Sequence, residues 1–398
     1  MKRKRQVVVI GLLLALGLSV MSNMDFGVRR QRLEDRAELR LKLPTEAVVL
    51  NASCVESPSG NISILMPYNA SQPVRHVWND PLPKNNNLFL NESSTPSSAS
   101  YAVCAFQGDR PYAFHLPHTM QQLYKCFSYW LAFPNKKPIL LNTIKQHSRF
   151  VKGFTRALRD VFAVEWDENN NNNNNSNNNN NSTTGKRQQL LQQYANVAVE
   201  PAETPAYAFL TSQHARTLAD GVLRHYFAKK PTACPIDGPR IGILNRAKSR
   251  TFSNLSVLQQ ALQETFPTSP VHIVYFEESQ FLDQVHFFAA HDIVVSPHGA
   301  QLAGIPFMPA CSGLLEVFPA RYYLPDYFQG LAQSSGIYHA TLYLSNHSDP
   351  LHETAVARQQ KQVAAARGVP LCPPWNKIRE GVEALVELHY ACCMASIS

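Results

Sequence analysis

Short apolar runs alternate with amphipathic segments along most of the chain from Tyr101 onward. Runs rich in β-branched residues predict strands, and segments with apolar residues three or four apart predict helices. The predicted strands are 101–106, 138–141, 197–199, 240–244, 271–276, 293–295 and 314–318, and the predicted helices are 118–133, 150–162, 215–227, 255–264, 279–290, 327–336 and 377–392. Because strands and helices alternate, we expect an α/β fold with parallel sheets and crossover helices.

Two segments interrupt this alternation. Residues 169–185 are mostly asparagine at their start and cannot build a core, so they predict a disordered insertion. The proline-rich segment 231–239 predicts a hinge. We therefore expect two Rossmann-like domains that face one cleft. Their predicted limits are 101–236 and 237–345, followed by an extension over 346–398 whose terminal helix is expected to pack back across the hinge.

The N-terminus has the pattern of a membrane-targeting segment. Four basic residues precede an uncharged stretch, 6–23, whose apolar centre is 7–21. This length suits either a signal-peptide core or a short spanning helix. Basic residues before the segment favour a cytosolic N-terminus, and no convincing small-x-small cleavage site follows. We predict a cytosolic tail and signal anchor over 1–23 in a single-pass type II protein, with a cleaved signal peptide as the alternative.

The region after the anchor is typical of a luminal or extracellular protein. Residues 24–100 become rich in Ser, Pro and Asn, which predicts a glycosylated stem. Asn-x-Ser/Thr acceptors stand at Asn51, Asn61, Asn69, Asn91, Asn254 and Asn346. The eight cysteines show no metal-ligand spacing and suit an oxidising compartment.

The formal net charge of +8 could suggest a nucleic-acid partner. The excess is spread out, much of it lies near the N-terminus, and no basic stripe with interleaved aromatics occurs. We therefore expect no nucleic acid partner. The charge is compatible with an anionic sugar nucleotide, and equally with a solvated surface that binds nothing.

A His-Gly-Ala turn follows the predicted strand 293–295. Ligands of open α/β sheets bind at the carboxyl ends of strands. There Gly299 would let the backbone approach a ligand, His298 could donate a hydrogen bond to an anion, and a helix starting at Ala300 would offer free N–H groups. The strand 314–318 would carry Glu316 to the same edge. The alternative is a buried strand pair with a satisfied histidine in its turn.

A second cluster, with Arg246, Lys248, Ser249, Arg250 and Asn254, follows the strand 240–244. Two guanidinium groups four residues apart could converge on a pyrophosphate, on the same rim as the His-Gly-Ala turn. An exposed basic turn without function is the alternative, since such spacing is common.

These motifs resemble glycosyltransferase family 61, a family of inverting transferases that includes protein O-linked N-acetylglucosaminyltransferases and plant xylan xylosyl- and arabinosyltransferases. The resemblance covers about 240–340, with a second part over 101–160. It is carried by NRAKSRTFSN at 245–254, HDIVVSPHGAQLAGIPFMP at 291–309, LLEVFP at 314–319 and YFQGLAQSSGIYH at 327–339.

The resemblance implies the GT-B fold and a uridine diphosphate (UDP) sugar as donor. It implies that Arg246 and Arg250 contact the donor phosphates, and that Glu316 and Phe318 lie near the nucleoside. The full set of expected donor-binding residues is Arg246, Ser249, Arg250, Asn254, His298, Gly299, Ala300, Gln301, Leu302, Glu316 and Phe318.

An inverting transferase also needs a base for the acceptor hydroxyl. The H-x-x-H segment of the family matches His115 and His118, either of which titrates near neutral pH, and Asp109 is a further candidate. Relatives commonly carry an acidic residue next, where this chain has Thr119 and Met120. The two histidines could equally be structural residues at a helix start.

The chain contains no D-x-D motif, through which many transferases hold a metal. We therefore expect no metal and no cofactor, with the UDP-sugar as co-substrate. The prediction is a Golgi or endoplasmic reticulum type II glycosyltransferase that moves N-acetylglucosamine, xylose or arabinose to a glycan or glycoprotein. The alternative is an inactive relative that binds a nucleotide sugar or a glycan. A secreted α/β hydrolase is disfavoured because no G-x-S-x-G elbow occurs.

Overall fold

The computed structural model describes residues 61–65, 101–105, 115–141, 148–166, 198–201, 209–228, 231, 233–235 and 237–396. The predicted anchor, most of the predicted stem, Asp109 and the asparagine-rich insertion lie outside these residues. Within the described ranges, no helix combines the length and the apolar character needed to cross a bilayer.

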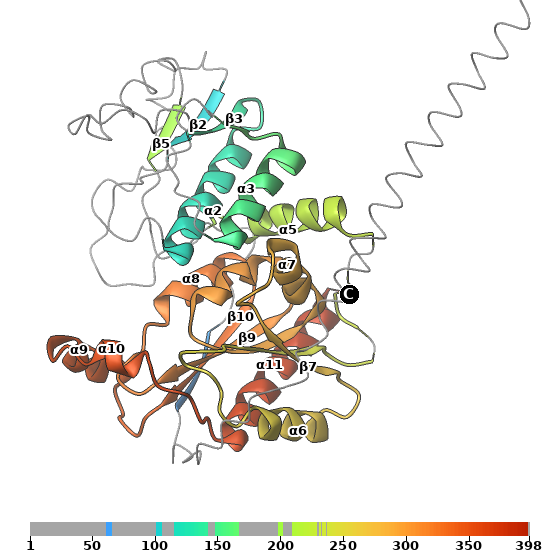
Figure 1. The fold of residues 1–398 in the computed structure, drawn as a ribbon. Helices are drawn as coiled ribbons and strands as arrows, with labels where there is room; N and C mark the ends of the chain where they lie inside the picture. The colour runs from blue at the N-terminus through green and yellow to red at the C-terminus, as the bar shows by residue number, and fades with distance from the viewer. Residues whose placement is uncertain are drawn as a thin grey trace, which may run out of the picture. The chain divides into compact units, whose positions relative to one another are not determined.

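The larger of two sheets has six strands in the order β1-β10-β9-β8-β6-β7 (Figure 1). The strands β6, β7, β8, β9 and β10 are parallel, and β1 pairs antiparallel with β10 at the edge. Their bounds are β1 Asn61–Leu65, β6 Ile241–Asn245, β7 Val271–Tyr275, β8 Ile293–Pro297, β9 Gly313–Pro319 and β10 Tyr338–Leu344. The mainly parallel α/β class expected from the sequence is confirmed.

Helices bury both faces of this sheet. On one face, α6 (Leu255–Thr265) and α11 (Trp375–Ala395) share an apolar core with the strands. On the other face lies α7 (Phe281–Ala290), where Phe287 packs so closely on Gly242 that a Cβ there would stand 2.8 Å from its ring. Because both faces are covered, the strands are almost wholly apolar, as buried parallel strands are.

The chain reverses its direction of winding at β6. From β6 it crosses to β7 on one side and then returns to β8 on the other side of β6. The carboxyl ends of β6 and β8 therefore form the topological switch point of the sheet, where a crevice for ligands is expected. β8 continues through Pro297 because its pairing with β6 ends at Val295 and no β6 partner needs the missing N–H.

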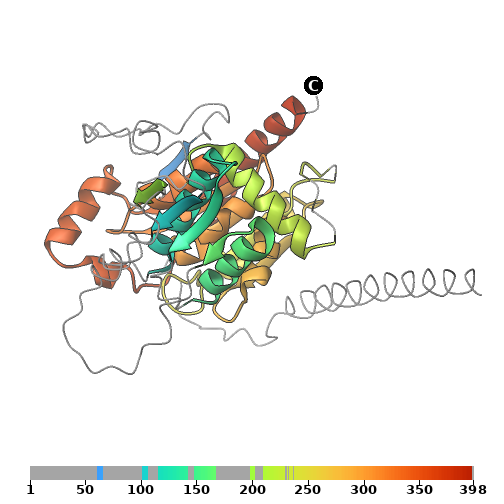
Figure 2. The same ribbon diagram turned by 90° about the horizontal axis from the view of Figure 1, so that it is seen from above.

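The smaller sheet is parallel throughout, in the order β4-β3-β2-β5. Its strands are β2 Tyr101–Ala105, β3 Lys137–Leu141, β4 Glu165–Trp166 and β5 Ala198–Pro201. Its segment of the chain also forms helices α2 (Leu116–Ala132), α3 (Arg149–Phe162) and α5 (Ser212–Tyr226), seen from above in Figure 2.

Both sheets belong to one compact unit of the chain. Within it, the segment of the smaller sheet contacts the turn that follows β8 in the larger sheet. That turn is a 3₁₀ helix, η3 (Ala300–Phe307), in place of the helical start expected at Ala300. The Tyr124 hydroxyl of α2 donates to the Ala303 carbonyl at 2.7 Å. Arg216 of α5 donates to the carbonyls of Pro306, at 2.7 Å, and Met308. Side chains of α2 and α5 thus donate hydrogen bonds to the backbone of η3 and of the residue that follows it.

The C-terminal segment is part of the larger α/β unit. The terminal helix α11, which the sequence predicted to pack back across the hinge, packs on β8, β9 and β10. A disulfide nevertheless ties its Cys393 to Cys234 in the proline-rich segment. The other disulfides are Cys104–Cys126 and Cys311–Cys392, and Cys372 is also disulfide-bonded.

The predicted elements all occur, with ends shifted by a few residues. Within the described residues, the structure adds five elements that the pattern did not predict, β1, β4, β10, α9 (Pro350–Gln359) and α10 (Val363–Ala366). β1 lies in the region assigned to the stem, where polar residues between its apolar positions concealed it. Helix α8 (Asp326–Ser334) matches the expected helix near 327–336.

Candidate functional site

His298 stands directly after β8, at the switch point. Its backbone N–H donates to the Val317 carbonyl of β9 at 2.9 Å, which continues the sheet pairing. Its ring stacks on Phe318 at a centroid distance of 4.8 Å and meets the edges of Tyr322 and Phe328. The imidazole is therefore fixed by packing, with only 7% of the residue exposed.

Glu316 lies between two histidines in the interior of the sheet. Its two carboxyl oxygens are 2.6 Å from Nδ1 of His298 and 2.9 Å from Nε2 of His339. Glu316 and His339 are both completely buried. The carboxyl group of Glu316 therefore has no exposed surface. A direct contact with a nucleoside, which the resemblance implied, would need this group to be accessible.

Burial determines the protonation states of His298, Glu316 and His339. It raises the pKa of Glu316 well above its ordinary value and lowers the pKa of His298 well below its own, with the arginines nearby acting in the same direction on His298. The pKa of His339 falls to about 3 because it is desolvated. Both imidazoles are neutral at physiological pH. Since Nδ1 of His298 faces Glu316, its Nε2 is the atom directed toward the Tyr322 hydroxyl, at 3.5 Å.

Arg246 follows β6 and reaches the turn after β8. Its Nη1 donates to Oε1 of Gln301 at 3.1 Å and its Nη2 to Oγ of Ser249 at 3.2 Å. The amide nitrogen of Gln301 in turn donates to Ser296 and to the Pro297 carbonyl. A Cβ on Gly299 would stand 2.0 Å from Nη1 of Arg246, so only glycine permits this approach. Here glycine makes room for a guanidinium group of the protein itself.

Arg250 has the most unusual environment of the site. Only 5% of the residue is exposed, yet its Nε and Nη1 have no hydrogen-bond partner among the described residues. Its backbone is left-handed, with φ of 56°, a conformation that costs a residue with a Cβ about 1 kcal/mol or more. Its guanidinium lies over the Tyr322 ring, 5.4 Å from the centroid.

The two arginines stay charged without a carboxylate partner in the part of the chain that the structure describes. Burial lowers the pKa of Arg246 to about 10, aided by the charge of Arg250, and burial also lowers the pKa of Arg250. Both remain protonated at neutral pH. A buried charge without a partner is costly, so this arrangement favours binding of an anion that would complete the unfilled hydrogen bonds.

The H-x-x-H residues lie at the start of α2 and face this site. Burial lowers the pKa of His115, and the charges of Arg367 and Arg250 lower it further. Burial and the neighbouring His115 lower the pKa of His118. The two rings are 5.5 Å apart, and His118 meets the edge of the Tyr327 ring at 5.1 Å. Both histidines are thus neutral at physiological pH and able to accept a proton.

The remaining predicted residues have other placements. Nδ2 of Asn254 donates to the Pro373 carbonyl at 3.0 Å, so this side chain fastens the C-terminal segment. Leu302 is completely buried, while Ala300 is partly exposed at the start of η3. Phe318 is completely buried as the platform under His298. Asp109 lies outside the described residues.

Three residues of the site were not predicted. Tyr322 follows β9 and His339 lies in β10, both within the part of the chain that the resemblance covers. The residues around each of them do not indicate a role in the site. Arg367 lies after α10, in the predicted extension, and its guanidinium stands 5.5 Å from the Tyr322 centroid. Nothing in the sequence around Arg367 distinguishes it from a surface arginine.

Among the described residues, one group of three potential metal ligands has its atoms close together, namely Cys234, Cys311 and Cys393. All three sulfurs are in disulfides, so they offer no thiolate.

Comparison with known families gives one match. The model of the family described as Glycosyltransferase 61 matches residues 114–315, about half of the chain. The match starts just before His115 and ends just before Glu316, so it includes both arginines of the loop and the turn after β8. No curated protein matches the chain significantly.

Proposed function

This chain belongs to glycosyltransferase family 61, and we propose that it is an inverting transferase with a UDP-sugar as donor. As a member of the family it is a glycosyltransferase, of class EC 2.4. The acceptor would be a glycan or a glycoprotein, and the sugar N-acetylglucosamine, xylose or arabinose.

The observation that carries this proposal is the buried guanidinium of Arg250 beside Arg246 at the switch point, because its Nε and Nη1 have no hydrogen-bond partner among the described residues. In the proposed reaction the bond between the anomeric carbon and the diphosphate oxygen breaks, and its electron pair stays on the diphosphate. Negative charge therefore develops on the leaving group. Preorganised guanidinium donors in a site of low solvent exposure stabilise such charge strongly. The proposal accordingly needs neither a metal nor a cofactor.

The proposed base is one of the two histidines at the start of α2. Its neutral imidazole takes the proton of the acceptor hydroxyl while that oxygen attacks the anomeric carbon from the face opposite the diphosphate. We favour His115 over His118 because the charges of Arg250 and Arg367 contribute to the lowered pKa of His115, whereas the charge that lowers the pKa of His118 is that of His115. Thr119, where relatives commonly have an acid, is buried on α2 and takes no part in this step.

The proposal includes the wider architecture that the family implies. The two sheets would be the two Rossmann-like domains of a GT-B transferase, with the acceptor bound by the segment 101–236 and the donor by 237–345. The N-terminal segment would anchor the protein in the Golgi or endoplasmic reticulum membrane with these domains in the lumen.

The test uses the full chain in detergent with a panel of UDP- and GDP-sugars, and measures the melting temperature and the release of free nucleotide. A donor that binds the folded state raises the melting temperature by mass action. We expect one UDP-sugar to stabilise the protein and to be turned over slowly. His115→Ala should abolish most turnover and keep the stabilisation, whereas His347→Ala, an exposed histidine elsewhere, should change neither.

Two results would contradict the proposal. Stabilisation by a UDP-sugar without any turnover, with or without glycan acceptors, would support an inactive binding relative. Absence of stabilisation by every nucleotide, with the protein demonstrably folded, would refute the donor assignment.

A further inference from the structure

We infer that Arg367 is a third ligand of the donor's diphosphate, so that the donor site includes the C-terminal segment beyond the family match. This inference rests on the proposed function, because it takes the anion at the site to be the diphosphate of a sugar nucleotide. It adds a binding residue that neither the sequence motifs nor the matched residues contain.

The position of Arg367 relative to Tyr322 is the first argument. The guanidinium of Arg367 lies 5.5 Å from the Tyr322 ring centroid, and that of Arg250 lies 5.4 Å from the same centroid. Two cations against one ring repel each other, and the ring's quadrupole offsets only part of this repulsion. An anion bound to both guanidinium groups would remove the conflict.

The C-terminal segment is joined to the arginine loop by backbone hydrogen bonds. The Arg250 N–H donates to the Val369 carbonyl at 3.2 Å, and the Leu371 N–H donates to the Thr251 carbonyl at 2.7 Å. A parallel bridge pairs Phe252 with Leu371. The left-handed backbone of Arg250 is held in place by this pairing. The segment that carries Arg367 therefore also positions Arg250, which is expected if both serve one ligand.

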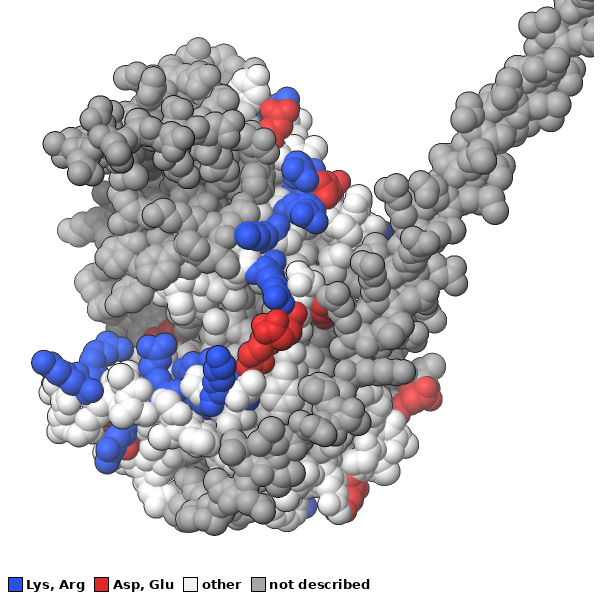
Figure 3. All heavy atoms as spheres, viewed as in Figure 1, with Lys and Arg blue, Asp and Glu red and all other residues white. Residues whose placement is uncertain are grey.

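The charge around the site supports the same conclusion. The positive charge of Arg367 lowers the pKa of His115, of His298 and of Arg246, three residues from three different elements. Arg367 is exposed and has no ion pair with a carboxylate within the described ranges. Figure 3 shows Lys and Arg side chains gathered over the α9–α10 segment and along the neighbouring face.

Arg250 supplies the independent sign of a ligand. It is more than nine-tenths buried, and two of its nitrogens, Nε and Nη1, have no hydrogen-bond partner in the described structure. Arg246, in contrast, already donates to Gln301 and Ser249. A diphosphate has enough oxygens to accept from Arg250 and to reach Arg367 on the open side. Arg250 would hold the buried side of the anion and Arg367 its exposed side.

The test compares the dissociation constants of three probes, UDP, uridine and inorganic pyrophosphate, for the full chain by calorimetry. Arg367→Ala should weaken UDP and pyrophosphate about tenfold to a hundredfold, as expected for the loss of a charged hydrogen bond. It should leave uridine binding unchanged. The matched control is Arg358→Ala, which removes the same charge from an exposed position on α9 and should change none of the three constants.

The outcomes separate this inference from the proposed function. If Arg367→Ala binds UDP and pyrophosphate as the unchanged protein does, the inference is overturned while the transferase proposal stands. If the unchanged protein binds pyrophosphate but not UDP, and Arg367→Ala weakens pyrophosphate, the donor assignment fails and Arg367 remains an anion ligand. If neither UDP nor pyrophosphate binds the unchanged protein, both the inference about Arg367 and the proposed donor fail. Equal melting temperatures of the three proteins without ligand show that folding is unaffected.

Discussion

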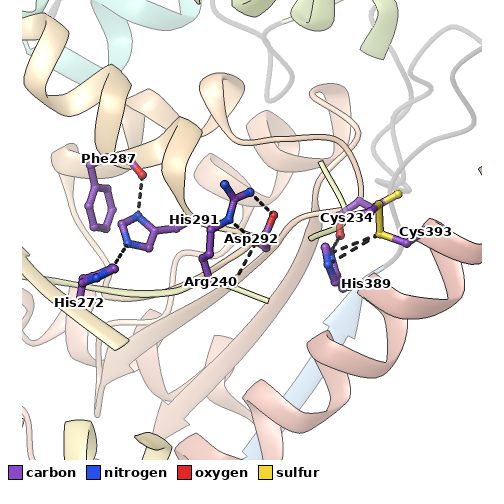
Figure 4. Close-up of polar contacts among 9 residues, drawn as sticks. Cys234, Arg240, His272, Phe287, His291, Asp292, His389 and Cys393 are labelled. Atoms are coloured by element: carbon purple, nitrogen blue, oxygen red, sulfur yellow. Dashed lines mark hydrogen bonds and ion pairs between the residues drawn. A yellow bond between two sulfur atoms is a disulfide. The ribbon is translucent and has the colours of Figure 1, made fainter. Parts of the chain in front are cut away.

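An arginine lies next to each end of β6, and a histidine lies near each end of β8. The amino and carboxyl ends of these strands differ in how the side chains are paired. At the amino end, the Arg240 guanidinium and its backbone N–H donate to the Asp292 carboxylate at 2.8 to 2.9 Å (Figure 4). In the same figure, Nδ1 of His291 faces the Phe287 carbonyl at 2.7 Å and its Nε2 faces His272 at 3.0 Å. Every one of these groups has a partner.

At the carboxyl end the pairing is incomplete. Two nitrogens of Arg250, Nε and Nη1, are buried without a hydrogen-bond partner among the described residues. Neither Arg246 nor Arg250 forms an ion pair with a carboxylate of those residues. Arg250 also has a left-handed backbone, which the amino end does not require of Arg240 or Asp292. The polar groups of the amino end are thus paired and stabilise the sheet, whereas the carboxyl end retains the hydrogen-bonding capacity and positive charge that the proposed diphosphate site requires.

The largest expected effect separates binding from stability at the carboxyl end. Arg250→Ala should lower kcat/KM with the UDP-sugar about 10²- to 10³-fold, because it removes a preorganised donor to the leaving group. The free energy of unfolding without donor should not fall, since the change removes a buried charge that had no carboxylate partner. Steady-state kinetics and urea unfolding measure the two quantities. Full activity in this variant would show that Arg250 is a structural residue.

The converse is expected at the amino end. Asp292→Ala leaves Arg240 and a backbone N–H without their acceptor, and should lower the free energy of unfolding by about 3 kcal/mol. The dissociation constant of UDP for the folded protein should stay the same. Asp283→Ala is the control, because it removes a partly exposed capping carboxylate of α7 and should cost about 1 kcal/mol. A loss of UDP affinity in Asp292→Ala without loss of stability would reverse the comparison.

A smaller effect is expected where the carboxyl ends of β6 and β8 lie side by side. Gly299→Ala places a Cβ 2.0 Å from Nη1 of Arg246 and 2.9 Å from Oε1 of Gln301, so both side chains must move. We expect UDP to bind about tenfold more weakly and uridine to bind as before, since a displaced guanidinium loses one charged hydrogen bond. Calorimetry with the two ligands checks this, and equal weakening of both would point to a general collapse of the turn.

The smallest expected effect is a displacement of the pH profile. The proposed base, His115, would act in its neutral form, and its pKa is lowered from the ordinary value of 6.5, first by burial and then by Arg367 and Arg250. The acid limb of kcat/KM should therefore lie below pH 6.5, with activity lost as the pH falls through the pKa of His115. Arg367→Ala removes a positive charge that opposes protonation, so the pKa rises and the acid limb moves to higher pH.

The control for the pH profile is again Arg358→Ala, which should leave the acid limb in place. An acid limb that does not move in Arg367→Ala would mean that His115 is not the group that titrates, and His118 would then be the stronger candidate.

Much of the fold was predictable because its signals are local. Apolar runs of β-branched residues marked the parallel strands, and the His-Gly-Ala turn and the arginine pair both stand where strands end. The resemblance to glycosyltransferase family 61 rested on these same motifs, and the family match confirms it. β1 was missed because its strand exists only through pairing with β10, which lies far away in the sequence.

The sequence by itself determined the class of fold, the family, and the two motifs that meet at the switch point of the sheet. Only the tertiary structure decided what each side chain does there. Glu316 is buried between two histidines, Asn254 holds the C-terminal segment, and Arg367 joins Arg250 at Tyr322. The physical reason is that strand and turn propensities act over a few neighbouring residues, whereas burial, unfilled hydrogen bonds and the proximity of charges depend on residues brought together by the fold.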